Sequence, residues 1–295
     1  MSPGDLGATS ARVSAVREPA PGGRSLVAGA GSRRPGTLER WRLGLWMGRA
    51  GIGALVIVAW TVAVRARWVD KFFVSEPSDI FRFLVGHFVG EILPHGAVTV
   101  ASTLIAFALA GTCGVLAALL LSEVPLLREL LDPFITALNA LPRIALAPLF
   151  ILWFGIGIAS KVAVAFSLTF FIVLLNTMAG FKNVDPNLLR LSRSLGCSRW
   201  QQFTKITFPW AVPSIFAGFK LGIIYCFMGV ILGEMLASKA GLGQLVVFYA
   251  GVFRTDGVLA ILLVLAVAAI LLSAVADWVE SLLLGSWIEP FGKRT

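Results

Sequence analysis

Residues 185–213 read DPNLLRLSRSLGCSRWQQFTKITFPWAVP, and this polar interval separates two long apolar stretches of the chain. Its charged side chains are one acid and four bases: Asp185, Arg190, Arg193, Arg199 and Lys205. Charge of this density does not belong inside a bilayer, so the interval marks a break between two membrane crossings. The positive sign of the charge favours the cytoplasmic side.

The interval predicts two short helices joined by a bend. Asp185 suits the N-cap position of the first helix, and Pro186 suits its first turn. Gly196 can adopt the left-handed conformation that ends a helix. Ser198 and Gln201 have the spacing of a capping box that begins the second helix. We therefore expect a helix–glycine–helix segment that is apolar on one side and cationic on the other.

We call residues 185–209 the elbow. Pro209 and Pro213 are expected to end its second helix and to lead into the next membrane crossing. A plain solvated loop that fixes topology and binds lipid head groups explains the charges equally well. The two caps and the central glycine favour a shaped element, which a soluble partner can push on.

The rest of the chain has the composition of a membrane protein. Of its 295 residues, 57% are hydrophobic and 14% are charged, and the mean hydropathy is +0.86. Soluble domains are nearer one quarter charged, and several apolar runs here approach the ~20 residues that a bilayer-spanning helix needs. We predict an all-α, polytopic membrane protein with about six transmembrane helices. The expected spans are 46–64, 97–121, 133–154 (broken by prolines), 162–180, 214–238 and 258–276, the last extending to about residue 288.

Three regions are expected along the chain. Residues 1–45 are rich in Gly, Pro, Ser, Ala and Arg, and are predicted to be a disordered, basic cytoplasmic tail and not a signal peptide. Residues 46–96 hold the first span and an external segment with a short interfacial helix that starts at Ser78. Residues 97–288 form the transmembrane domain that carries the elbow.

Lysine and arginine set the expected orientation. With the N-terminus inside, sixteen of these residues fall in cytoplasmic segments and seven in external ones, and an excess of this kind is typical of the cytoplasmic side. We therefore predict a multi-pass protein of the cytoplasmic (inner) membrane with both termini in the cytoplasm. The net charge of +9 is explained by this placement, so nucleic acid is not an expected partner.

The sequence shows no signature of an enzyme or of a metal site. It lacks the Gly-x4-Gly-Lys-Ser/Thr frame that holds phosphates, so the chain is not expected to hydrolyse ATP. It also lacks Gly-x-Ser-x-Gly and HExxH motifs, which argues against a membrane enzyme. Neither a metal site nor a disulfide framework is expected from the spacing of the histidines and cysteines, which are His87, His95, Cys113, Cys197 and Cys226.

An ion-coupled secondary transporter is the main alternative, and it would need a carboxylate or polar cluster deep in the bilayer. Glu234, near the outer end of the fifth span, is the candidate. We favour a residue that caps the helix end or pairs with Lys239 over a gate residue that faces the pore. Asn139 and Arg143 flank Pro142 in the third span, where Arg143 either attracts an anionic substrate or satisfies carbonyls that the prolines free. The candidate residues of the translocation path are therefore Asn139, Pro142, Arg143 and Glu234.

Small residues line two of the expected spans. They are Gly218, Gly222, Gly229 and Gly233 in the fifth span, and Ala106, Ala110, Gly114 and Ala118 in the second. Such surfaces let helices approach closely. The sequence leaves open whether they serve packing within the chain or contact with a second copy.

The elbow resembles the EAA loop of permeases from ATP-binding-cassette (ABC) importers. That loop reads Glu-Ala-Ala, three residues, Gly, nine residues, Ile, one residue and Leu-Pro. Here Gly196 is followed after nine residues by Ile206, and Pro209 keeps its spacing. A base stands where the family has its acid, because the Glu-Ala-Ala positions fall on Arg190, Leu191 and Ser192.

Three other segments are similar to the sulfonate, taurine and nitrate branch of these permeases. Residues 141–157, LPRIALAPLFILWFGIG, are similar to their third span. Gly233–Glu234–Met235 followed by Gly241–Leu242–Gly243 is similar to the end of their fifth span, and residues 73–83 to their external loop. The resemblance covers about residues 52–288 and implies the type I ABC importer permease fold.

The resemblance also implies a function. The chain would be a permease subunit that translocates a small solute, such as an alkanesulfonate, taurine or a nitrate-like anion. Its partners would be a dimer of ATPase subunits that bind ATP and Mg, an extracytoplasmic substrate-binding protein and a second permease copy, with no cofactor on this chain. The elbow would dock in a groove of the ATPase. The coupling residues would be Arg190, Leu191, Ser192, Gly196, Ile206 and Pro209.

Overall fold

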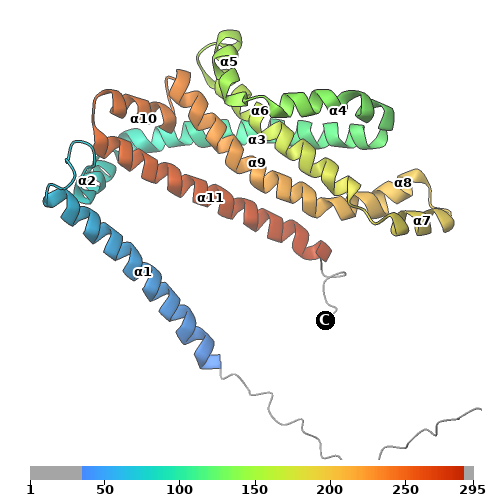
Figure 1. Ribbon diagram of the computed structural model, residues 1–295, viewed down its shortest axis with the longest axis horizontal. Helices are drawn as coiled ribbons and strands as arrows, with labels where there is room; N and C mark the ends of the chain where they lie inside the picture. Colours follow the sequence, from blue (N-terminus) through green and yellow to red (C-terminus); the bar gives the residue numbers. More distant parts are fainter. Residues whose placement is uncertain (1–34, 289–295) are drawn as a thin grey trace, which may run out of the picture. The chain divides into compact units, whose positions relative to one another are not determined.

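The computed structural model describes residues 35–288, and these residues form helices joined by turns and loops (Figure 1). No strand occurs in this range, so the predicted all-α class is confirmed. The α-helices are α1 (Pro35–Arg65), α2 (Pro77–His87), α3 (Leu93–Glu123), α4 (Pro125–Ala140), α5 (Ala147–Phe154), α6 (Ile158–Lys182), α7 (Pro186–Ser194), α8 (Arg199–Gln202), α9 (Phe208–Ala237), α10 (Leu242–Gly251) and α11 (Thr255–Ile288). Shorter turns are the π-helices η1 (Phe88–Ile92) and η3 (Phe203–Thr207) and the 3-10 helix η2 (Arg143–Leu146).

Internal contacts divide the chain into two units, Met1–Leu55 and Val56–Thr295, with the boundary inside α1. Of the first unit, the structure describes residues 35–55, which are helical. The helix begins at Pro35 and not at residue 46, because proline suits a first helical turn and good helix formers follow it. Residues 1–34 of the predicted tail lie outside the described residues.

Within the described range, five helices are long and apolar enough to cross a membrane, and the bent pair α4–α5 brings the number to six if it counts as one span. This agrees with the six spans expected from the sequence. The bent pair turns by 84° at its break. The first half begins at Pro125 and not at residue 133, and it ends at Ala140 because Pro142 favours an extended residue before it. Leu141 has that conformation, with φ −63° and ψ 138°.

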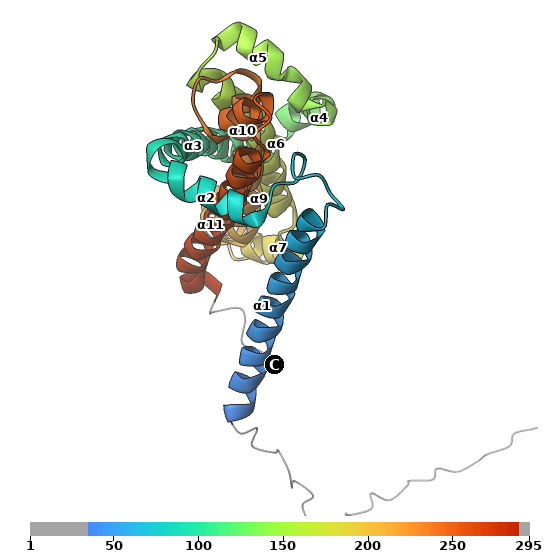
Figure 2. The same ribbon diagram turned by 90° about the vertical axis from the view of Figure 1, so that its left-hand side faces the viewer.

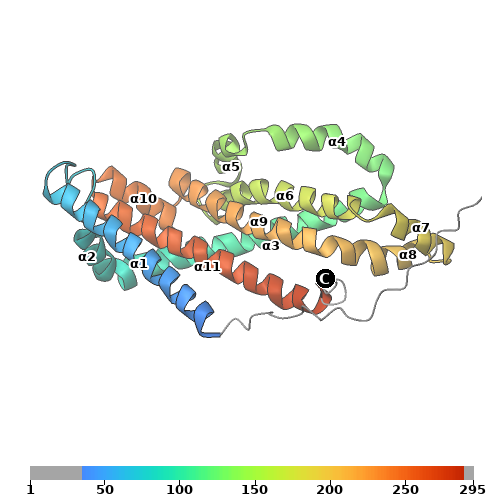
Figure 3. The ribbon, with the colours of Figure 1, turned by 60° about the horizontal axis from the view of Figure 1, so that its bottom comes forward.

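The packing of the unit Val56–Thr295 centres on α6, which lies against both α9 and α3 (Figure 3). The four glycines of α9 face α6. A Cβ at Gly229 would lie 2.8 Å from the Cα of Ala165, and one at Gly233 would lie 2.7 Å from the Cβ of Lys161. The small residues of α3 are also buried within the chain. Both small-residue surfaces therefore serve packing within the chain.

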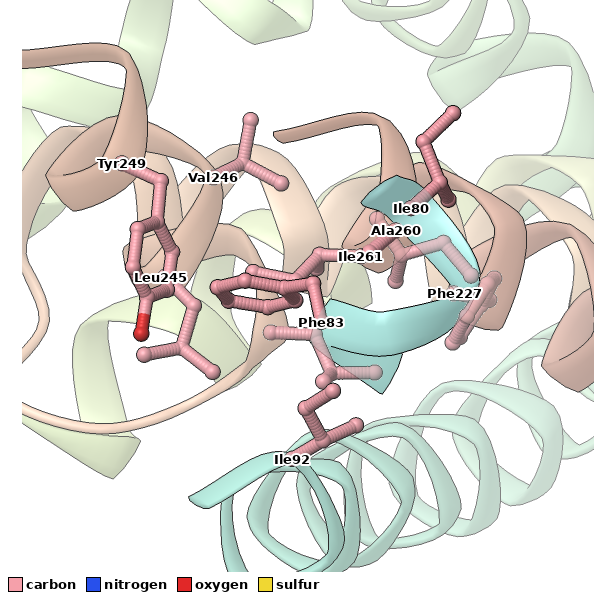
Figure 4. Close-up of a cluster of buried hydrophobic side chains, with 11 residues drawn as sticks. Ile80, Phe83, Ile92, Phe227, Leu245, Val246, Tyr249, Ala260 and Ile261 are labelled. Carbon is pink, nitrogen blue, oxygen red and sulfur yellow. The ribbon is translucent and has the colours of Figure 1, made fainter. Parts of the chain in front are cut away.

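One end of this unit is formed by α2, α10 and the start of α11 (Figure 2). Phe83 and Tyr249 meet edge to face there, with ring centroids 5.0 Å apart, inside a cluster of buried apolar side chains (Figure 4). The Tyr249 hydroxyl donates to Glu91 at 2.6 Å. Helix α10 was not among the predicted elements, because ten residues are too few for a span and lie in the interval between two spans.

The elbow lies at the opposite end of α6 and α9 (Figure 1). The predicted stop at Pro209 and Pro213 is wrong, because helix continues from Arg199 to Ala237. The π-helical turn η3 ends at Thr207, two residues before Pro209. Its wider turn can accommodate the proline, which has no N–H to donate and whose ring crowds the carbonyl of the preceding turn. Pro213 lies inside α9.

Candidate functional site

The elbow has the local structure that its sequence predicts. The Asp185 carboxylate accepts a hydrogen bond from the backbone N–H of Asn187 at 2.8 Å. Gly196 has φ 78°, in the left-handed region that favours glycine. Ser198 and Gln201 form a capping box, with reciprocal hydrogen bonds of 3.2 and 2.9 Å. Local hydrogen bonds therefore fix both helix starts and the bend between them.

Gln202 clamps the two helices of the elbow together. Its side-chain amide donates to the carbonyl of Leu189 and to the hydroxyl oxygen of Ser192, both at 2.9 Å. Ser192 is 3% exposed, although most of the elbow is in contact with solvent. The last Glu-Ala-Ala position thus takes part in a buried joint between α7 and α8. Sequence reasoning missed Gln202, because its partners lie ten and thirteen residues away.

The other predicted coupling residues are either exposed on the elbow or half-buried where the elbow joins α9. The elbow exposes large apolar side chains, namely Leu191 (56%), Leu195 (74%) and Trp200 (72%). Arg190 is exposed as well, and nothing lies within 4 Å of a Cβ built on Gly196. Ile206 and Pro209 are half-buried where the elbow joins α9. Apolar side chains gathered on an otherwise polar segment are typical of a protein contact.

The break in the α4–α5 pair brings Asn139, Pro142 and Arg143 together. Nη2 of Arg143 donates to the backbone carbonyl of Asn139 at 2.9 Å and also to its side-chain oxygen. Nη1 reaches the carbonyls of Ser167 and Leu168 on α6, at 3.4 and 3.3 Å. Arg143 thus satisfies backbone carbonyls at a proline break, which is one of the two roles expected for it.

The charge of Arg143 has no carboxylate partner within ion-pair distance in the described part of the chain. Its guanidinium carbon lies 4.6 Å from the centroid of the Phe171 ring, and its buried Nε atom has no hydrogen-bond partner. All of its acceptors are neutral carbonyl oxygens. The break therefore carries an uncompensated positive charge.

Glu234 lies in a buried polar cluster. Lys161 Nζ donates to its carboxylate at 3.1 Å, and the two side chains are 2% and 0% exposed. The Thr99 hydroxyl donates at 2.9 Å, and the backbone N–H of Gly243 donates at 3.0 Å. The partner of Glu234 is thus Lys161 of α6, and the expected pairing with Lys239 is not what the structure shows.

The loop after α9 closes over this ion pair. Lys161 Nζ also donates to the carbonyl of Ala240 at 3.1 Å. Gly241 has φ 128°, and a Cβ there would collide with the Glu234 carboxylate. His95 on α3 accepts a hydrogen bond from the N–H of Gly241 at 3.1 Å. The Gly-Leu-Gly segment after Gly-Glu-Met therefore has a packing reason: a side chain at Gly241 would fill the space that the carboxylate occupies.

In the buried cluster, sequence reasoning missed Lys161 and Thr99. Lys161 stands at the start of an apolar run, where it was counted among the external bases. A charge that adjoins a long apolar segment is a usable signal, because ionisable groups at membrane depth require a partner. The identity of the partner lies in the fold, since Glu234 is 73 residues away. No group of three His, Cys, Asp or Glu is placed to hold a metal ion among the side chains that the structure describes.

Residues 110–284 match the family of binding-protein-dependent transport system inner membrane components. The chain belongs to this family. The permease is 31% identical over 230 residues to the riboflavin transport system permease protein RibX of Chloroflexus aurantiacus, covering 78% of this chain and 86% of that protein. It is 30% identical over 227 residues to the taurine transport system permease protein TauC of Escherichia coli, covering 75% and 82%. It is 29% identical over 255 residues to the putative aliphatic sulfonates transport permease protein SsuC of Bacillus subtilis, covering 85% and 90%.

Solved structures support the fold. A chain of the methionine ABC transporter MetNI in an inward-facing conformation aligns with a TM-score of 0.56 at 18% identity, covering 64% of the permease and 94% of that chain. A chain of an amino acid ABC transporter aligns with a TM-score of 0.51 at 18% identity, covering 62% and 93%. The type I importer permease fold expected from the sequence is thereby confirmed.

The permease is a multi-pass subunit of an ABC importer and a transport protein, not an enzyme. This sets aside the ion-coupled secondary transporter that the sequence left as the alternative. Membership of the family implies association with an ATPase and with a substrate-binding protein.

Proposed function

We propose that the permease works as a homodimer whose two elbows each dock in a groove of an ATPase subunit. The ATPase subunits bind ATP and Mg, while this chain binds no cofactor. Their closure pulls the elbows together and switches the membrane gate. In this arrangement the elbow and both termini face the cytoplasm, and the substrate-binding protein docks on the opposite side of the membrane.

The exposed apolar side chains of the elbow carry this proposal. Leu191, Leu195 and Trp200 stand on a polar segment, and the described chain leaves more than half of each residue exposed. Burying a leucine of this kind against a partner contributes about 1.5–3 kcal/mol. The Gln202 clamp joins α7 to α8, so a force on this face passes into η3 and α9. Arg190 stands beside the apolar face where the family has an acid, so the ATPase groove is expected to present an acidic residue to it.

A small organic or inorganic anion is the proposed cargo, such as an alkanesulfonate, taurine or a nitrate-like ion. The uncompensated charge of Arg143 at the broken span supports an anion, because a positive charge of low hydration draws anions into a pathway. The relatives TauC and SsuC are named for taurine and aliphatic sulfonates. RibX is named for riboflavin, so an aromatic heterocycle is the competing cargo.

A pair of substitutions at Gly196 tests the coupling role. Gly196→Val places a β-branched side chain at φ 78°, which costs about 1–2 kcal/mol in backbone strain although the space is open. Gly196→Asn is the matched control, because asparagine adopts this conformation readily. In the reconstituted complex, valine should abolish ATP hydrolysis stimulated by the loaded binding protein, and asparagine should keep it. Normal stimulation with valine, in a variant that inserts into the membrane, would refute the role of the bend.

A further inference from the structure

A second candidate site adjoins the elbow, and the exposed apolar residues of the elbow do not line it. A half-open cavity of about 650 Å³ lies between α7–α8, the end of α6 and the junction of α3 with α4. This volume is in the range of small-molecule sites. The cavity is distinct from the face assigned to the ATPase, because Leu191, Leu195 and Trp200 do not line it.

The lining of the cavity is strongly cationic. Four bases reach it from four different helices: Arg128 on α4, Lys182 on α6, Arg193 on α7 and Arg199 on α8. Glu123 is the one acid among the lining residues. Among the side chains that the structure describes, none forms a hydrogen bond or ion pair with the side chains of these four bases. Gathering like charges without a counter-ion is unfavourable, and a bound anion would relieve it.

Apolar side chains also line the cavity. Met178, Phe181 and Leu189 line it, and Phe181 is 9% exposed. A lining that combines four bases with apolar side chains fits an oxyanion that is attached to, or lies beside, apolar groups. Arginine side chains match the oxygens of a phosphate in a bidentate manner, which gives them an advantage over a single point charge.

We propose that this cavity binds a phosphate-type oxyanion, either as a free ion or as the head group of an anionic phospholipid. The bound group bridges α4 to the elbow, because Arg128 belongs to α4, and Arg193 and Arg199 belong to the elbow. This inference does not depend on the identity of the transported solute or on the coupling role of Gly196. Failure of the Gly196 experiment would therefore leave it standing, and the reverse also holds.

The test uses the full-length permease in nanodiscs. In one arm the lipid is phosphatidylcholine alone, and calorimetry measures the binding of inorganic phosphate. In the other arm phosphatidylglycerol is mixed with phosphatidylcholine, and native mass spectrometry measures which lipid stays bound. The double variant Arg193→Gln/Arg199→Gln removes the two lining bases of the elbow, and Arg128→Gln removes the lining base of α4. Lys205→Gln is the matched control, since Lys205 is an exposed base of the same elbow outside the cavity.

In the arm that shows binding, the double variant should bind about tenfold or more weakly than the wild type. Arg128→Gln should also bind measurably more weakly than the wild type, and Lys205→Gln should bind as the wild type does. Loss in the phosphate arm assigns the site to a free ion, and loss in the lipid arm assigns it to a head group. The proposal is overturned if the wild type binds in neither arm, or if Lys205→Gln weakens binding as much as the double variant. It is also overturned if adding the ATPase subunits abolishes binding, because the cations then belong to a protein contact.

Discussion

Lys161 and Glu234 place two opposite charges where neither side chain is more than 2% exposed. Replacing only one of them leaves the other charge buried and unpaired, which is expected to lower the free energy of unfolding by about 3–5 kcal/mol. We predict this loss for Lys161→Met and for Glu234→Gln, and a much smaller loss for the double variant than the sum of the two. Unfolding in detergent, followed by circular dichroism, gives the double-mutant cycle. Strictly additive losses would show that the two residues stabilise the fold independently.

Arg143 combines two roles that one pair of substitutions can separate. Lysine keeps the charge but loses the fork that reaches two sets of carbonyls. Glutamine keeps hydrogen-bonding capacity and loses the charge. If the charge draws an anionic solute, we predict that Arg143→Gln raises the KM for uptake about tenfold, while Arg143→Lys raises it much less. The expected reason is electrostatic, so the difference between the variants should shrink at high salt. Equal uptake by the two variants would assign Arg143 to carbonyl satisfaction alone.

Helix packing sets the expected effects at the scale of whole elements, because α6 and α9 touch through glycines. A Cβ at Gly229 would lie 2.8 Å from the backbone Cα of Ala165, so the two helices would have to separate. We predict that Gly229→Ala lowers the free energy of unfolding by about 1–3 kcal/mol, the usual effect of overpacking. Gly86→Ala on α2 is the control, because nothing lies within 4 Å of the added atom. The control should be neutral or up to about 1 kcal/mol stabilising, since alanine favours helix.

The elbow shows which parts of this fold a sequence can predict. Its caps depend on hydrogen bonds between residues no more than three positions apart, so the spacing of Asp185, Ser198 and Gln201 was sufficient. The run of helix through Pro209 was not predicted, because the rule that proline ends a helix takes no account of a π-turn before it.

The buried cluster shows where local reasoning stops. Glu234 was recognised as a candidate, but the expected roles were a cap of the helix end or a pair with Lys239, five residues away, whereas its partner is Lys161 in another helix. The ion pair exists because α6 and α9 pack closely at Gly233, a contact that no local pattern records. For the same reason, the sequence did not show which helices the small-residue surfaces of α3 and α9 pack against.

At the scale of the whole molecule, the source of energy is the property that separates this importer from an ion-coupled carrier. An ion-coupled carrier needs a carboxylate that is free to take up and release protons or sodium along its path. Glu234, the candidate for that role, is held by Lys161, Thr99 and the N–H of Gly243. The two side chains of the ion pair are 2% and 0% exposed, so separating them would leave a buried, unpaired charge. Coupling to a proton gradient through this residue is therefore not expected.

We predict that uptake stops when ATP is depleted and continues in the presence of an uncoupler as long as ATP is maintained. The measurement is solute uptake into proteoliposomes that contain the assembled complex, with the binding protein outside and ATP enclosed. Enclosed ADP replaces ATP as the matched control, and the Gly196→Val complex reports any leak that does not pass through the coupled route. If the elbow transmits the energy of ATP hydrolysis, the rate of solute uptake depends on the enclosed ATP and does not depend on the pH gradient. A rate that instead collapses with the gradient at constant ATP would mean that the carboxylates of this chain, and not the exposed face of its elbow, receive the driving force.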